Sequence, residues 1–340
     1  MTQSLTPRPV AHPATRSTPS GTRRLLRAVT IAACLPYLTL KVVWVAGGRL
    51  GIPAGSPLLE HPTAMVAANL LTVLMDGAVI VLALLLTRPW GLRVPAWLLV
   101  PPLWAASGLL APIMTGYPLQ MLVRAFGGSA GGTSGGSDEP FLREWVFVVV
   151  YTGFIVQGLA LGTLGLLYAR DRWGYLWRGR VWDLPAGLMG TRQRATAVAA
   201  AVAALFPLAL RLLWACGGTT GLSEGRIAGR SSDFHVLEFL YVAFLLVAVT
   251  GGWLLAFRRC PGLPVRVPLA LAWTGSGAVA CWGGWMTLAA LLADEPANRP
   301  TALMLLTYAV QMIVGILVAT VAVHHARSLP VPAARHRPGP

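Results

Sequence analysis

The chain has 340 residues, of which 55% are hydrophobic and 11% are charged, and its mean hydropathy is +0.64. A soluble domain carries about 25% charged residues, so this composition excludes one and indicates a membrane protein. The formal net charge of +15 suggests nucleic-acid binding as another class. The placement of the basic residues, described below, argues against a nucleic-acid partner.

Eight apolar segments, each long enough to cross the roughly 30 Å hydrocarbon core of a bilayer, follow one another along the chain. They lie at about 26–48, 63–87, 95–114, 143–169, 195–218, 234–257, 267–292 and 301–325. Helices satisfy their own backbone hydrogen bonds in lipid, and the alternation of barrel strands is missing from these segments. The sequence therefore predicts an all-α, polytopic integral membrane protein with eight transmembrane helices.

The basic residues gather in alternate connecting segments. With the N-terminus placed inside, the inner segments hold 19 of the 27 Lys and Arg residues, and the outer loops hold eight of the 12 acidic residues. By the positive-inside rule, both termini are expected in the cytoplasm. Lys41 is the only lysine among the basic residues, and such arginine-rich composition is typical of a high-GC bacterial genome. We therefore expect a bacterial cytoplasmic membrane, with lipids as the surrounding partner.

The two halves of the chain resemble each other. Residues 37–52 (YLTLKVVWVAGGRLGI) and 207–222 (PLALRLLWACGGTTGL) align at a constant offset of 170. This alignment pairs Lys41 with Arg211, Trp44 with Trp214, Gly47 with Gly217, and Gly51 with Gly221. Because each unit has an even number of spans, both units share one orientation. The sequence predicts two parallel four-helix repeats related by an axis near the membrane normal.

The domain boundaries follow from this repeat. We expect a disordered cytoplasmic tail at 1–22, a first four-helix repeat at 23–170, a cytoplasmic interfacial linker at 171–194, a second four-helix repeat at 195–327 and a cytoplasmic tail at 328–340. The first tail is rich in Pro, Ser and Thr, and the linker mixes arginine with tryptophan and tyrosine. The Gly/Ser-rich segment 127–136 is expected to be a flexible external linker.

Four ionisable residues lie inside the predicted spans: Lys41, Asp76, Arg211 and Glu238. Each costs roughly 2.5–3.5 kcal/mol at a helix centre, so such side chains face the bundle and have partners. Arg211 and Glu238 lie at similar depth on consecutive helices, which predicts an ion pair. Asp76 lies near the midplane, where Lys41 would have to reach inward to contact it. Pairing that only fixes the helices together is an equal alternative for all four residues.

Neighbours on the same helix faces complete the candidate sites. They are Tyr37 and Trp44 beside Lys41, Asn69 and Thr72 beside Asp76, and Trp214 beside Arg211. Tryptophan faces stabilise cations, although an interfacial belt or packing explains many of the 13 tryptophans equally well. The four cysteines show no metal-ligand spacing, and no nucleotide, hydrolase or Asp-rich diphosphate motif is present. We therefore expect no metal and no cofactor.

The stretches LPYLTLKVVWVAGGRLGI (35–52) and TRPWGLRVPAWLLVPPLWAASGLLAP (87–112) resemble a set of eight-span membrane proteins of actinobacteria. By its span count, the chain is also similar to integral-membrane terpene cyclases of indole-sesquiterpenoid pathways, without a matching catalytic motif. That resemblance implies metal-independent, proton-initiated cyclisation of a prenylated hydrophobic substrate.

In such a cyclase, Asp76 would donate the proton and Glu238 would orient Arg211 or serve as a second acid. The remaining candidates would bind the substrate: Tyr37, Lys41, Trp44, Asn69, Thr72, Arg211 and Trp214. The first alternative is a proton-coupled transporter of a small amphiphile, with Asp76 as the coupling site. The second alternative is a non-catalytic membrane scaffold. The sequence leaves the oligomeric state open.

Overall fold

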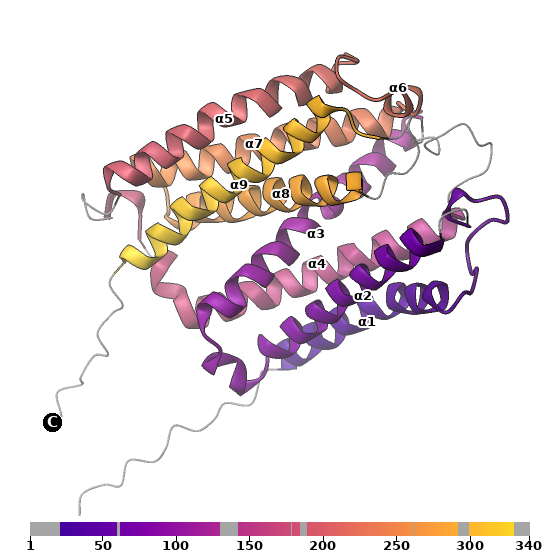
Figure 1. The fold of residues 1–340 in the computed structure, drawn as a ribbon. Coiled ribbons are helices and arrows are strands. Elements are labelled where there is room, and N and C mark those ends of the chain that lie inside the picture. Colours follow the sequence, from indigo (N-terminus) through magenta and orange to yellow (C-terminus); the bar gives the residue numbers. More distant parts are fainter. Residues whose placement is uncertain are drawn as a thin grey trace, which may run out of the picture.

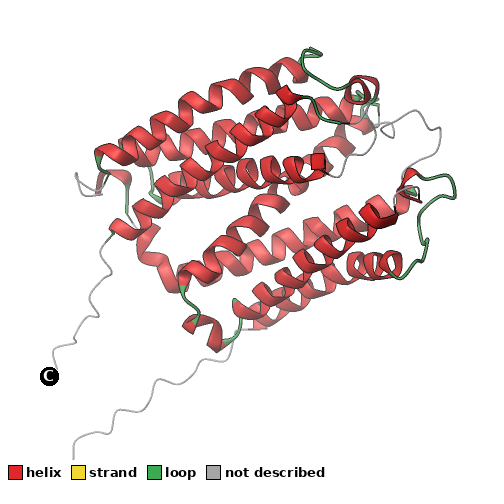
Figure 2. Ribbon diagram, viewed as in Figure 1, coloured by secondary structure: helices red, strands yellow, loops and turns green. Residues whose placement is uncertain are grey.

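The computed structural model describes residues 21–59, 62–129, 142–177, 179–183, 189–260, 262–291 and 299–329. Within these residues the secondary structure is helical and no β-strand forms (Figure 2), which confirms the predicted all-α class. Most of the expected tails at 1–22 and 328–340, and most of the Gly/Ser-rich segment 127–136, lie outside the described residues.

Eight long helices are found in the described part of the chain, one at each predicted span. They are α1 (Gly21–Val45), α2 (Pro62–Leu85), α3 (Ala96–Ala125), α4 (Glu144–Trp173), α5 (Thr191–Ala215), α7 (Ser232–Phe257), α8 (Arg266–Leu291) and α9 (Ala302–Ser328). Short helical turns connect some of them: η1 (Pro57–Leu59), η2 (Pro89–Arg93), η3 (Gly174–Trp177), η4 (Val181–Asp183) and α6 (Glu224–Ala228). Helix α3 continues past the predicted end at 114.

Seven of the long helices, all except α8, are long and apolar enough to cross a membrane. Helix α8 has 26 residues, but glycine, serine and tryptophan take the place of larger aliphatic side chains along much of it. The chain is therefore a multi-pass helical membrane protein. Its seven clear spans agree with seven of the eight predicted ones.

The long helices lie side by side in two groups (Figure 1). Helices α1, α2, α3 and α4 pack with one another in the first group, and α5, α7, α8 and α9 in the second. The packed pairs α1–α2, α1–α4, α2–α3, α2–α4 and α3–α4 have counterparts in α5–α7, α5–α9, α7–α8, α7–α9 and α8–α9. The start of α1 and the end of α9 lie at the same end of the molecule (Figure 1).

Helix α3 joins the two groups, since it packs against α7 and α8 as well as against its own group. The indole nitrogen Nε1 of Trp104 on α3 donates a hydrogen bond to Oγ of Ser276 on α8, at 3.0 Å. In return, Nε1 of Trp273 on α8 donates to Oγ of Ser107 on α3, at 2.9 Å. These two reciprocal bonds hold the seam between the groups.

The backbones of α3 and α8 approach each other at this seam. A Cβ atom added to Gly108 would lie 2.4 Å from the carbonyl carbon and oxygen of Gly277. Small residues permit such contact between membrane helices, because helix association in lipid depends on close packing. At the C-terminal end of α3, Arg124 forms an ion pair with Asp233 in the first turn of α7.

Helices α1 and α5 end in the same kind of turn. Gly47 and Gly217 have φ angles of +87° and +95°, and Gly51 and Gly221 both have +76°. Side chains disfavour this left-handed region, so glycine is the residue that ends a helix in this way. The glycine pairs that recur in the sequence at an offset of 170 therefore serve the same local geometry in both groups.

Candidate functional site

Arg211 lies on α5 inside the second group, where it is 3% exposed. Its Nη1 atom donates to both carboxylate oxygens of Glu238 on α7, each at 2.9 Å. Its Nη2 and Nε atoms donate to Oε1 of Gln311 on α9, at 2.8 and 3.3 Å. The predicted ion pair between Arg211 and Glu238 is confirmed, and together with Gln311 it joins three helices.

Aromatic rings surround this guanidinium. Its Cζ atom lies 4.2 Å from the ring centre of Tyr241, 5.3 Å from that of Tyr308 and 5.4 Å from that of Trp214. Ring faces attract a cation, and the attraction is stronger where water is excluded. The charge of Arg211 is thus balanced by a carboxylate, an amide and three rings. This site has the features of a satisfied, buried ion pair.

Lys41 occupies the matching place on α1, with different partners. Its Nζ atom donates to Oδ1 of Asn69 on α2, at 2.7 Å, and lies 4.8 Å from the ring centre of Tyr37 and 5.0 Å from that of Trp44. The helix face predicted for these residues is therefore present. A neutral amide accepts the hydrogen bond here, whereas a carboxylate accepts it in the second group.

The indole groups beside the two cations are held alike. Nε1 of Trp44 donates to the carbonyl oxygen of Leu50 at 2.8 Å, and Nε1 of Trp214 donates to that of Thr220 at 2.9 Å. Each tryptophan thus bonds to the backbone six residues further on, in the turn that ends its helix. Both rings are fixed by the turn, and both are buried.

Asp76 lies deeper in the first group than Asn69, by about 10 Å at 1.5 Å of helix rise per residue. It is 4% exposed. Lys41 is near enough to attract it, but the described residues include no ion pair between the two, since the ammonium bonds to Asn69. The polar neighbour of Asp76 on α4 is Gln157, whose side-chain amide interacts with the carboxyl group.

The hydroxyl of Thr72 lies between Asn69 and Asp76 on the same stripe of α2. It donates to backbone carbonyl oxygens one turn earlier in the helix, and it also interacts with the phenol group of Tyr37. The Tyr37 ring in turn contacts Phe154 on α4 edge-on, with ring centres 4.9 Å apart. Polar and aromatic groups from α1, α2 and α4 therefore meet around the acid.

The candidate residues divide between the two helix groups. One set gathers between α1, α2 and α4: Tyr37, Lys41, Trp44, Asn69, Thr72 and Asp76. The other set gathers between α5, α7 and α9: Arg211, Trp214 and Glu238. The structure brings each set together and places the two sets in separate groups, so that Trp44 and Trp214 lie beside different cations.

Sequence reasoning missed the two buried amides, Gln157 and Gln311, each 2% exposed. Both stand in the middle of apolar helices, as FIVQGL and YAVQMI in the sequence. A polar side chain in lipid is costly unless it has a partner, so an isolated glutamine in a span is a signal of an interhelical contact. Both amides are neutral and lie on helices without a candidate ionisable residue, so the sequence pattern did not include them.

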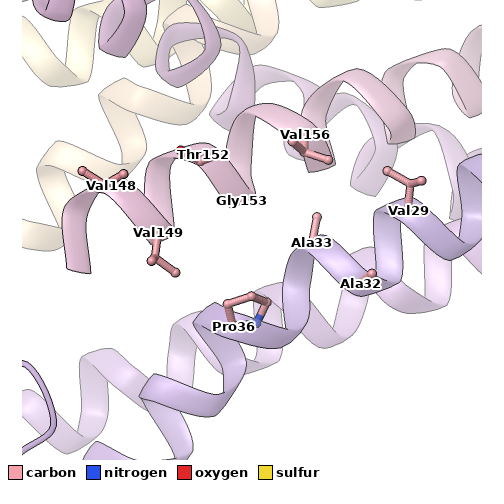
Figure 3. A pocket seen from close by; sticks show the side chains of 9 residues that line it. All are labelled: Val29, Ala32, Ala33, Pro36, Val148, Val149, Thr152, Gly153 and Val156. Carbon is pink, nitrogen blue, oxygen red and sulfur yellow. The ribbon is translucent and has the colours of Figure 1, made fainter. Parts of the chain in front are cut away.

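An apolar groove of about 470 Å³ opens between α1 and α4 (Figure 3). Its wall consists mainly of small and branched side chains, among them Val29, Ala33, Pro36, Val149, Gly153 and Val156. The residues next to Pro36 and Gly153 in the chain are Tyr37 and Phe154, which contact each other. The groove therefore lies on the two helices that carry the aromatic side of the Asp76 site.

Comparisons with protein-family models, curated proteins and solved structures found no match. The fold and the residues alone therefore assign the class, a multi-pass helical membrane protein with charged and amide side chains buried inside its two helix groups.

Proposed function

We propose that this protein is a membrane enzyme that cyclises a prenylated hydrophobic substrate without a metal, using Asp76 as the proton donor. The observation that carries the proposal is the contrast between the two buried acids. Glu238 is bound on both oxygens by Arg211, whereas Asp76 has no cation in direct contact among the described residues. We assign to Glu238 the role of orienting Arg211, and to Asp76 the chemistry.

The proposed reaction begins with transfer of a proton from Asp76 to one carbon of a terminal C=C bond, which leaves a carbocation on the other. An internal double bond attacks this carbon, and a new C–C bond and a new cation form. Loss of a C–H proton to the Asp76 carboxylate then restores the acid, so the product has the mass of the substrate. Aromatic faces stabilise the cations on the way, and Tyr37 and Phe154 are near the acid.

The groove between α1 and α4 supports a hydrophobic substrate, because it is apolar and lies between the two helices that carry Tyr37 and Phe154 (Figure 3). Tyr37, Lys41, Trp44, Asn69 and Thr72 would bind the substrate in the first group. Arg211 and Trp214 would act at a distance, by fixing the second group.

We further propose that α8 also spans the membrane, so that the chain forms two parallel four-helix repeats. The matching helix pairs and the matching glycine turns support this arrangement. Both termini would lie in the cytoplasm of a bacterial cell, as the distribution of the basic residues suggests.

The test uses membranes that contain the wild-type chain, Asp76→Asn or Glu144→Gln, incubated with a panel of prenylated aromatics and polyenes. Glu144 is an exposed acid at the start of α4, so its variant is a matched control. Liquid chromatography with mass spectrometry should show a product of unchanged mass and shifted retention with the wild type and the control. Undiminished product from Asp76→Asn would contradict the assignment of the acid.

The second candidate is a proton-coupled transporter of a small amphiphile. The observation that favours it is the seam through which α3 joins two similar helix groups, since paired bundles of this kind move against each other in many transporters. Uptake into sealed vesicles that requires a pH gradient would support transport, and activity in detergent would support the enzyme. A scaffold would be indifferent to Asp76→Asn in both assays.

A further inference from the structure

Gln157 on α4 faces Asp76, and it has no role in the proposed reaction as described so far. Its amide interacts with the carboxyl group, and one oxygen atom of each residue is left unpaired. Asp76 Oδ2 and Gln157 Oε1 are both buried, and neither has a hydrogen-bond partner among the described residues. Both atoms are acceptors when the acid is ionised, so they cannot bond to each other in that state.

Leaving two acceptors unpaired in an apolar interior is costly, at about 1–3 kcal/mol for each group. An isolated carboxylate is more costly still. One hydrogen atom between the two oxygens removes both penalties. A neutral acid donates through its O–H group to the amide oxygen, while the amide N–H group donates to the other acid oxygen. The result is a ring of two hydrogen bonds in which both of the unpaired oxygens gain a partner.

We propose that Asp76 and Gln157 form a carboxylic acid–amide pair, in which Asp76 Oδ2 holds a proton and donates it to Gln157 Oε1. Gln157 is then a positioning residue, because it determines which oxygen holds the proton and where that proton points. This inference deepens the proposed function, and its meaning for catalysis rests on that function. The proton is the same one that would start the cyclisation.

The other titratable groups around this pair have partners of their own. On α1, Cys34 Sγ bonds to the carbonyl oxygen of Thr30 at 3.2 Å, Tyr37 meets Thr72, and Lys41 bonds to Asn69. Those three groups interact with Asp76 electrostatically.

On the remaining sides, Tyr151 on α4 stacks on Tyr117 of α3, with ring centres 4.6 Å apart. Tyr151 interacts electrostatically with Tyr37, and so it reaches the Asp76 region through that residue. Gln157 supplies the amide that interacts with Asp76 itself.

Infrared spectroscopy of the purified full-length chain tests the pair without any substrate. At neutral pH, the wild type should show the C=O band of a protonated carboxylic acid, and Asp76→Asn should lose it. Gln157→Leu should keep the band but move it to higher frequency, because the acid loses its hydrogen-bond partners. Gln311→Leu, which alters the buried amide beside Arg211, is the matched control and should leave the band in place.

The outcomes separate the pair from the proposed function. A band that is lost in Asp76→Asn but unmoved in Gln157→Leu overturns the pair while the proton donor stands. Absence of an Asp76-dependent band at neutral pH overturns the pair, and the isosteric Asp76→Asn variant suffices for that result even where Gln157→Leu does not fold. A shifted band together with unaltered substrates in the cyclisation assay supports the pair and contradicts the enzyme.

Discussion

At the scale of single residues, the buried Arg211 and the half-buried Lys41 occupy matching places and have unequal surroundings. Arg211 faces a carboxylate, an amide and three rings, whereas Lys41 faces an amide and two rings. A buried ion pair is strongly coupled, because removal of either partner leaves an uncompensated charge. The first group avoids this coupling, and its acid lies deeper, beside Gln157. Divergence between the two sites is therefore concentrated in the acid.

Glu238→Gln should lower the free energy of unfolding by about 3–5 kcal/mol, since the buried guanidinium loses its counter-charge. The double variant Arg211→Met/Glu238→Met should recover most of this loss, because neither charge then remains buried. Denaturant unfolding in detergent micelles, followed by tryptophan fluorescence, measures both effects. A double variant that is less stable than Glu238→Gln would contradict the account of Arg211 as a residue that needs its counter-charge.

At the scale of helices, the seam between α3 and α8 requires close contact between the two backbones. Gly108 lies against the backbone of Gly277, and the Trp104–Ser276 and Trp273–Ser107 hydrogen bonds depend on that closeness. A methyl group at Gly108 has no free space, so the helices would have to separate. Glycine is thus required here by contact rather than by backbone conformation.

Gly108→Ala should destabilise the protein by about 1–3 kcal/mol, as expected when a well-packed site is overfilled. The control is Gly77→Ala on α2, where an added Cβ meets nothing within 4 Å. That control should be neutral or stabilising by up to about 1 kcal/mol, because alanine favours a helix more than glycine does. Chemical unfolding of the two variants compares them directly, and a shift of the same sign and size in both would refute the close contact.

Length and apolar character were sufficient to predict the positions of the eight long helices in the described residues, seven of which are long and apolar enough to cross a membrane. The sequence prediction missed the extension of α3 to Ala125, since Pro112 and Pro118 are helix breakers in soluble proteins but are tolerated within a packed bundle. The Arg211–Glu238 pair could be predicted because the two residues lie at similar depth in the membrane on consecutive helices. The Asp76–Gln157 contact could not, because it depends on how α2 and α4 rotate about their axes, and spans that are apolar all round leave that rotation undetermined.

At the scale of the whole molecule, the placement of the charges predicts how the chain is oriented in the membrane. Two native cysteines allow this orientation to be tested. Cys216 follows α5 and Cys260 follows α7, and both are exposed. The ends of these two helices lie on opposite sides of the molecule (Figure 1). The proposed topology places Cys216 outside the cell and Cys260 in the cytoplasm.

A maleimide that cannot cross membranes should label the chain in intact cells through Cys216. Labelling should disappear in Cys216→Ser and persist in Cys260→Ser, and opened membranes should allow both sites to react. Mass spectrometry of the modified peptides identifies the site. Labelling of Cys260 alone in intact cells would reverse the orientation. Labelling of both cysteines would place them on the same side and contradict a membrane crossing by α7 between them.

The reciprocal bonds of Trp104 and Trp273 have a consequence for the origin of the chain. Each helix gives its neighbour the same contact that it receives, which is the property of an isologous interface between identical subunits. In the proposed two-repeat arrangement, a half-length chain with this helix would meet a second copy of itself as a homodimer. Gene duplication and fusion through 171–194 would then make a reversible association permanent, and free one copy of the site to change.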